Sequence, residues 1–246
     1  MREVRFLCLA VSRKMNGYCI AGIDIDSGEW IRPISPCSYG ELGSREITVE
    51  GHGTQSPRLM ETLDVICLRL AKQSASVGQP ENWALDLSTK SLPHRLLAQR
   101  AEDDSVLAQI SDLAEKSSSS SLLLGTPGKE ISHREIQNEP LSRSLCVIRP
   151  KGLTWVRTTN FKNKPRIEGR FDLGERNIRY CLSLTDIAWE AKLLAMTVNG
   201  QSLDAFEVPG VDANLRILLT ISLGDLFEKT RCHYKLIAGV LLLPQE

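Results

Sequence analysis

Residues 4–34 read VRFLCLAVSRKMNGYCIAGIDIDSGEWIRPI, and this stretch indicates most about the fold. It contains three runs rich in apolar and β-branched residues, namely 4–11, 18–24 and 30–34. Between the runs lie Asn16-Gly17 and Asp26-Ser27-Gly28, which are residue types that tolerate the backbone angles of tight turns. The stretch therefore predicts a meander of three strands, in which the second and third strands pair directly.

Strand patterns recur later in the chain. Residues 62–70 place apolar side chains on both faces, so this strand is expected to be central. The pattern returns in the second half, in the segments 145–149, 153–158, 177–184, 215–223 and 234–243. A chain of 246 residues exceeds one typical domain, whereas two units of about 100 to 150 residues would each bury a core. We predict a mainly β fold with helical insertions, built from two β-barrel halves, 1–140 and 141–246.

A helical insertion is predicted in the first half. Residues 92–116 repeat apolar side chains at three- and four-residue spacing, which indicates one or two amphipathic helices. Pro93 fits the first turn of the earlier helix, and Asp104 is suited to the start of the later one. The serine run 117–121 predicts a flexible linker before Pro140. In the second half, residues 185–192 predict a short helix between strands.

Each half contains a Trp-apolar-Arg triplet on an early strand, Trp30-Ile31-Arg32 and Trp155-Val156-Arg157, as a duplicated module would. Because side chains alternate across a strand, the Trp and Arg of a triplet share one face and the apolar residue points to the other. With Ile31 and Val156 in the core, each half would expose a ring beside a guanidinium, which could bind a base and a phosphate. The alternative is that the tryptophans pack inside their barrels and the arginines pair with acids.

Charge is balanced overall but unevenly distributed. The chain has 30 basic and 30 acidic residues, yet residues 141–180 hold ten basic residues against three acidic ones. Within them, residues 157–171 interleave aromatic and cationic side chains in a predicted long hairpin loop. Phe161 or Phe171 would stack on bases, and phosphates would be contacted by Lys162, Lys164, Arg166 and Arg170. The alternative is a solvated loop that the acidic insertion neutralises.

A second candidate loop is Gln79-Pro80-Glu81-Asn82-Trp83, which offers amide, carboxylate and indole groups within five residues. Gln79, Glu81 and Asn82 could recognise the edge of a base. They could equally tie the loop to backbone amides, and this structural interpretation is favoured.

No catalytic motif is found in the sequence. The serine-hydrolase motif GxSxG, the zinc-protease motif HExxH and a phosphate-binding P-loop do not occur, and residues 125–129 have the wrong spacing for a P-loop. Asp24 and Asp26 could bind a metal for nuclease activity, but the turn residues around them favour a hairpin. The sequence has no CxxC pair, and the four histidines are far apart. We expect no catalytic residue, no metal and no cofactor, and therefore a protein that is not an enzyme.

Cysteine usage and hydropathy indicate the compartment. The seven cysteines are scattered, odd in number and mostly embedded in apolar runs, which is typical of a reducing environment. The apolar run near the N-terminus is too short, and its surroundings too mixed in charge, for a signal peptide. No stretch approaches the roughly 20 apolar residues that span a bilayer. We expect a cytoplasmic protein with no membrane partner.

Several segments together resemble a known family. The segments are 8–14, 19–23, 28–35, 79–83, 180–186 and 234–240, and they are similar to the bacterial dual OB-containing domain family. The resemblance implies two OB-like β-barrels in tandem, a place in bacterial conflict or defence gene neighbourhoods, and recognition of nucleic acid or nucleotides. It implies no catalytic residues.

These observations lead to a prediction of function. We predict a non-catalytic protein that binds exposed nucleic acid, single-stranded DNA or RNA, through the Trp-Arg pairs and the cationic loop. The alternative is a sensor of a small nucleotide, or an adaptor for an effector protein from the same operon.

Overall fold

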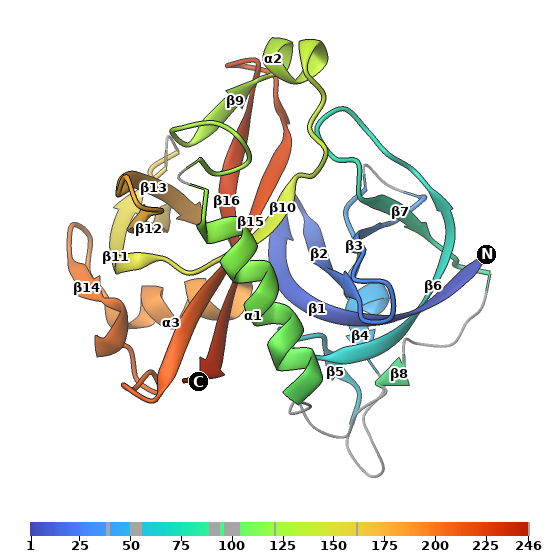
Figure 1. The fold of residues 1–246 in the computed structure, drawn as a ribbon, viewed down its shortest axis with the longest axis horizontal. Coiled ribbons are helices and arrows are strands. Elements are labelled where there is room, and N and C mark those ends of the chain that lie inside the picture. Colours follow the sequence, from blue (N-terminus) through green and yellow to red (C-terminus); the bar gives the residue numbers. More distant parts are fainter. Residues whose placement is uncertain are drawn as a thin grey trace. The chain divides into compact units, whose positions relative to one another are not determined.

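The computed structural model describes residues 1–37, 40–49, 56–88, 94–95, 104–120, 122–160 and 162–245, mostly as β-strands (Figure 1). The chain divides into two compact units, Met1–Gln109 and Ile110–Glu246. The predicted division lay later, after residue 140. The division comes earlier because residues 130–132 pair with a C-terminal strand of the second unit.

The first unit is a closed barrel of five strands. Their order is β1-β2-β3-β7-β6, and the pairing of β1 with β6 closes the barrel. β3 and β7 run parallel, whereas the other neighbours are antiparallel. The strands are β1 (Arg2–Lys14), β2 (Gly17–Asp24), β3 (Trp30–Ile34), β6 (Val65–Gln73) and β7 (Asn82–Leu85). The predicted three-strand meander and the direct pairing of β2 with β3 are confirmed.

Short elements complete the first unit. They are η1 (Ser44–Ile47), β4 (Thr48–Val49), β5 (Arg58–Leu59), which pairs with β4, and β8 (His94–Arg95), which pairs with β6. The earlier of the two helices predicted after Pro93 is wrong at residues 94–95, which form β8. The rest of that prediction, residues 92–93 and 96–103, lies outside the described residues.

The barrel requires a glycine where β1 and β2 meet. β1 has a register shift between Cys8 and Ala10, and Gly22 of β2 lies opposite Cys8. A Cβ atom on Gly22 would lie 1.9 Å from the carbonyl oxygen of Leu7 and 2.9 Å from the ring of Phe6. Since real Cβ contacts are never this short, the backbones can approach only without a side chain at this position.

The turn between β2 and β3 confirms the predicted hairpin. Gly28 has a φ of +70° and donates its amide to the carbonyl of Asp24 (2.8 Å). The Asp24 carboxylate accepts from Ser27 Oγ (2.8 Å) and pairs with Arg2 (2.6 Å). Asp26 pairs with Arg5, which lowers the pKa of the Asp26 carboxyl. Each carboxylate is thus engaged by an arginine.

The second unit repeats the strand order of the first. Its strands β11-β12-β13-β16-β15 are neighbours in this order, β13 and β16 run parallel, and α3 (Ile187–Met196) lies between the third and fourth strands in the chain. Within the described ranges, no pairing joins β11 to β15. The strands are β11 (Lys151–Thr159), β12 (Pro165–Leu173), β13 (Ile178–Leu184), β15 (Leu215–Phe227) and β16 (Cys232–Pro244), and the sheet is extended by β10 (Leu145–Ile148) on β15, β14 (Ser202–Asp204) on β11 and β9 (Glu130–Ser132) on β16.

The segment predicted as a flexible linker has regular structure instead. α1 (Asp104–Ser118) begins at the expected Asp104, and α2 (His133–Asn138) follows β9. Ser118 accepts a hydrogen bond from the amide of Arg149 (2.8 Å), and β9 pairs with β16. The linker prediction is wrong for the described part of residues 117–140, because strand pairing and hydrogen bonds hold this segment to the second unit.

The capping residue of α3 connects the helix to the sheet. One carboxylate oxygen of the buried Asp186 accepts from the amide of Trp189 (3.0 Å), and the other accepts from the amide of Val240 on β16 (3.0 Å). Burial raises the pKa of the Asp186 carboxyl to about 6. The predicted helix after residue 185 is confirmed. Along the described chain, none of the helices is long and apolar enough to cross a membrane.

Candidate nucleic-acid interface

The cationic segment forms a tight turn between two strands rather than a long loop. β11 and β12 pair up to Thr159 and Pro165. The amide of Asn160 donates to the carbonyl of Lys164 (2.9 Å), and the Asn160 side chain accepts from the amides of Lys162 (2.8 Å) and Lys164 (3.1 Å). One asparagine therefore fixes the turn and places two exposed lysines at its tip. Phe161, a predicted stacking residue, lies outside the described residues.

Alternation along β12 separates a charged outer face from a buried inner face. Ile167 and Phe171 are fully buried in the core, whereas Arg166, Glu168 and Arg170 are at least partly exposed. Because every second residue of a strand projects to the same side, Arg166 and Arg170 share the outer face. Two of the predicted cations, Arg166 and Arg170, thus lie on one face of β12, the strand that follows the turn with the two lysines.

The neighbouring strand adds a cation that the sequence did not identify. Arg170 lies opposite Cys181 of β13, and Asp172 lies opposite Arg179. Figure 1 shows β11, β12 and β13 side by side. Arg179 was missed because strand pairing, rather than sequence proximity, brings it to this face.

Ion pairs on this face leave an excess of positive charge. Arg166 pairs with Glu168, Arg170 lies 4.0 Å from the same carboxylate, and Arg179 pairs with Asp172 at 3.2 Å. Three guanidinium groups thus share two carboxylates, and the turn adds two lysines. We call these five cations, Lys162, Lys164, Arg166, Arg170 and Arg179, the cationic face.

The aromatic side chains of β12 and β13 are not on this face. Phe171 and Tyr180 are buried, and their rings stack with centroids 5.8 Å apart. The prediction that Phe171 could stack on a base is therefore wrong, because its strand position directs it into the core.

The prediction of an exposed Trp155 is also wrong. Trp155 has no exposed surface and lies opposite Gly169, with its ring centroid 6.0 Å from that of Trp189. A Cβ on Gly169 would come within 3.0 Å of the indole ring. The glycine leaves the space that the large ring fills, which is why the ring faces inward. Val156, predicted to be core, is buried as well.

The side chain of Arg157 binds the C-terminal end of α3. Its guanidinium donates to the carbonyl oxygens of Leu194 (3.0 Å) and Thr197, which lie at the C-terminal end of α3. These carbonyls have no partner within the helix, so the cation satisfies them and complements the helix dipole. The prediction that Arg157 stands beside Trp155 on an open surface is wrong.

The triplet of the first unit is also largely interior. Arg32 is 1% exposed, and its amide donates to the carbonyl of Glu81 (2.8 Å). Trp30 is half-buried, and its indole nitrogen is buried without a hydrogen-bond partner among the described atoms. β3 lies between β2 and β7 in the closed barrel, and successive residues Ile31 and Arg32, which project to opposite faces, are both buried. Surface exposure of Arg32 was wrongly predicted, whereas the expected burial of Ile31 is confirmed.

The loop between β6 and β7 is held by its own side chains. Asn82 Nδ2 donates to Gln79 Oε1 (3.2 Å) and to Ser76 Oγ (3.3 Å), and the main chains of Ser76 and Gln79 bond to each other. Gln79, Glu81 and Asn82 are all buried. This geometry fits the structural interpretation of these three residues and offers little to a base.

Metal ligation finds no support in the described ranges, where no group of three or more His, Cys, Asp and Glu side chains could hold an ion. The histidines closest to such an arrangement are His133 and His233, whose ring nitrogens Nδ1 and Nε2 lie 3.0 Å apart. His233 is committed on its other side to the carbonyl of Gly224 (2.9 Å).

The two units share one strand order, and in each unit the third and fifth strands run parallel. This arrangement defines a protein of two OB-type units. The chain belongs to the Dual OB-containing domain family, since the model of that family matches residues 4–240. This confirms the resemblance seen in the sequence. No curated protein matches the chain.

Proposed function

We propose that this protein binds single-stranded nucleic acid without catalysis, through the cationic face of its second unit. The observation that carries the proposal is the excess of five cations over two carboxylates on β12, β13 and the turn that precedes β12. The regularly spaced phosphates of a nucleic-acid strand are a suitable ligand for such a row of cations.

The place of the cationic face within the fold supports the proposal. OB barrels that bind oligonucleotides use the surface of their second and third strands and the loop between the first two. In the second unit these are β12, β13 and the turn 160–164. Since the rings of Phe171 and Tyr180 are buried, the described residues of this face offer charge rather than a stacking surface, and we expect little sequence preference.

Salt dependence tests the proposal quantitatively. Fluorescence anisotropy with a labelled oligo(dT) or oligo(U) strand should give an association constant that falls with salt, with a log–log slope of about −3 if four cations contact phosphates. Between 50 and 200 mM salt the affinity should drop about 50-fold. Neutralising Lys162, Lys164, Arg166 and Arg170 together to glutamine should flatten the slope towards zero.

A matched control separates this face from total charge. Lys116, Lys129, Arg134 and Lys229 are exposed cations of the same unit that lie outside the cationic face. Changing these four to glutamine alters net charge equally and should leave the slope near −3. Absence of binding at low salt, or equal loss in both quadruple variants, would refute the proposal.

The setting is proposed from the family. Recognition of exposed nucleic acid in the cytoplasm suits a bacterial conflict system, in which an effector protein from the same operon would act on what is bound. The alternative of a small-nucleotide sensor is distinguished in the same assay, because mononucleotides would then compete at concentrations where simple phosphate does not.

A further inference from the structure

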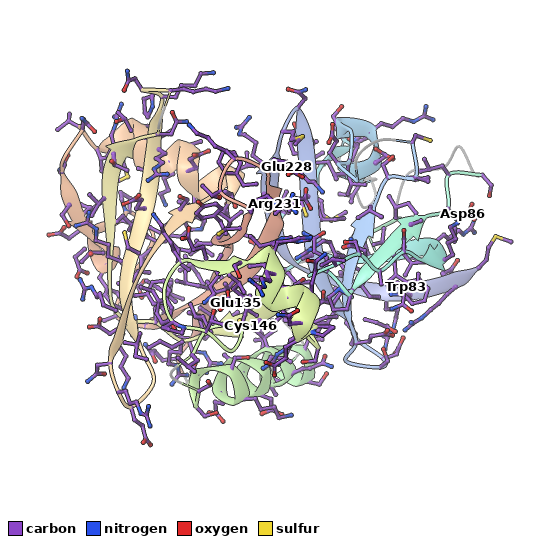
Figure 2. The ribbon with its side chains drawn as sticks, turned by 90° about the horizontal axis from the view of Figure 1, so that it is seen from above. Trp83, Asp86, Glu135, Cys146, Glu228 and Arg231 are labelled. Carbon is purple, nitrogen blue, oxygen red and sulfur yellow. The ribbon has the colours of Figure 1, made fainter. Side chains whose placement is uncertain are left out.

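A second, independent feature of the second unit is a cavity of about 460 Å³. It is lined by residues between Ser117 and Cys146, from the end of α1, the loop before β9, α2 and the start of β10. The volume falls within the range of small-molecule sites in proteins. Figure 2 labels two of its lining residues, Glu135 and Cys146, which lie near each other in that view.

Hydrogen bonds from buried side chains fix one wall of the cavity. Lys235 is 1% exposed, and its ammonium donates to Thr126 O (2.6 Å), Thr126 Oγ1 (2.8 Å) and Gly128 O (3.1 Å). The Tyr180 hydroxyl accepts from the amide of Leu123 (3.0 Å). Burial lowers the pKa of Lys235 to about 8, so holding this charge inside is costly. Three hydrogen bonds offset this cost, and they fix the backbone at Thr126, which lines the cavity, and at the nearby Gly128.

The floor of the cavity is apolar. Leu123, Ile131, Ile136 and Cys146 line it and are each almost fully buried. Their side chains would cover a branched or thioether side chain of a ligand. The described residues of the floor include no aromatic ring and so offer no stacking surface to a nucleobase.

The rim of the cavity offers one free charge of each sign. Glu139 and Arg143 both line the cavity, and among the described residues neither side chain makes a hydrogen bond or an ion pair. The other carboxylate, that of Glu135, accepts from the amide of Ser132 (2.9 Å). Two carboxylates against one guanidinium disfavour a ligand that is only anionic, such as a nucleotide.

We infer that this cavity binds a free α-amino acid with an apolar side chain, of the leucine or methionine class. Glu139 receives the ammonium group, Arg143 receives the carboxylate, and the apolar floor receives the side chain. The site is separate from the cationic face, so its failure would leave the proposed nucleic-acid binding unaffected.

Calorimetric titration of the full chain tests the inference with defined probes. L-leucine and L-methionine should bind, whereas leucinamide, which lacks the carboxylate, and N-acetyl-leucine, which lacks the ammonium, should bind at least about 10-fold more weakly. Glycine, which has no side chain for the floor, should not bind measurably.

Variants locate the site. Glu139→Gln and Arg143→Gln should each weaken leucine binding about 10-fold, while Arg134→Gln, an exposed arginine of α2 that does not line the cavity, should leave it unchanged. Since both substituted side chains are exposed, folding should be retained, and circular dichroism checks this. Absence of heat with every amino acid, equal binding of leucine and its two blocked analogues, or preferential binding of a nucleotide would overturn the inference.

Discussion

At the scale of single residues, Gly22 is the most demanding position of the first barrel. A methyl group there would overlap the carbonyl of Leu7, which belongs to the backbone and cannot rotate away. Gly22→Ala should lower the free energy of unfolding by more than about 3 kcal/mol, measured by denaturant unfolding. Gly43→Ala is the control, because its Cβ would lie 3.5 Å from the nearest atom and its φ of −75° suits alanine. Equal stability of the two variants would contradict this account of the barrel.

The burial of individual side chains could be predicted from the sequence at some positions and not at others. Alternation correctly predicted that Ile31 and Val156 are core, but it does not fix whether the opposite face is solvent or a second interior. Trp155 faces the core because Gly169, distant in sequence, makes room for it. That complementarity depends on strand register, so only the fold reveals it.

At the scale of elements, the carboxyl group that caps α3 should make stability depend on pH. Its pKa of about 6 in the folded protein exceeds the ordinary value of 3.8, so the folded state retains a proton that the unfolded chain releases. The contribution of Asp186 to the free energy of unfolding should therefore fall by up to about 3 kcal/mol as pH rises from about 4 to 6. Asp186→Asn should remove this decline, measured by urea unfolding at several pH values.

A second cap provides the comparison. Asp204 caps η2 (Ala205–Glu207) from an exposed position, accepting from the amide of Phe206 (2.9 Å). Asp204→Asn should retain the wild-type decline. An unchanged decline in Asp186→Asn would mean that another group causes it.

Elements were mostly predictable where apolar runs are long. The meander of β1 to β3 and the strands β13, β15 and β16 followed from composition and turns. β12 was mistaken for loop because charged residues occupy its outer positions, although its apolar residues alternate with them. The same charges form the cationic face, so the residues that obscured the strand are those proposed to function.

At the scale of the whole molecule, the division of the chain can be tested by truncation. A fragment 104–246 keeps α1, β9 and α2 and should unfold cooperatively on heating. A fragment 141–246, cut at the boundary predicted from sequence, removes the hydrogen-bond acceptors of Lys235 and leaves its ammonium buried without partners. Thermal unfolding followed by circular dichroism should show no cooperative transition for this shorter fragment. Equal melting of both fragments would favour the later boundary.

The three residues of β9 have a further effect beyond the stability that they add. By bonding to Cys232, His233 and Tyr234, they occupy backbone donors and acceptors along one side of β16. A strand left open in this way is a template on which another polypeptide can add. Because β9 already pairs with these residues, another polypeptide cannot add to this part of β16.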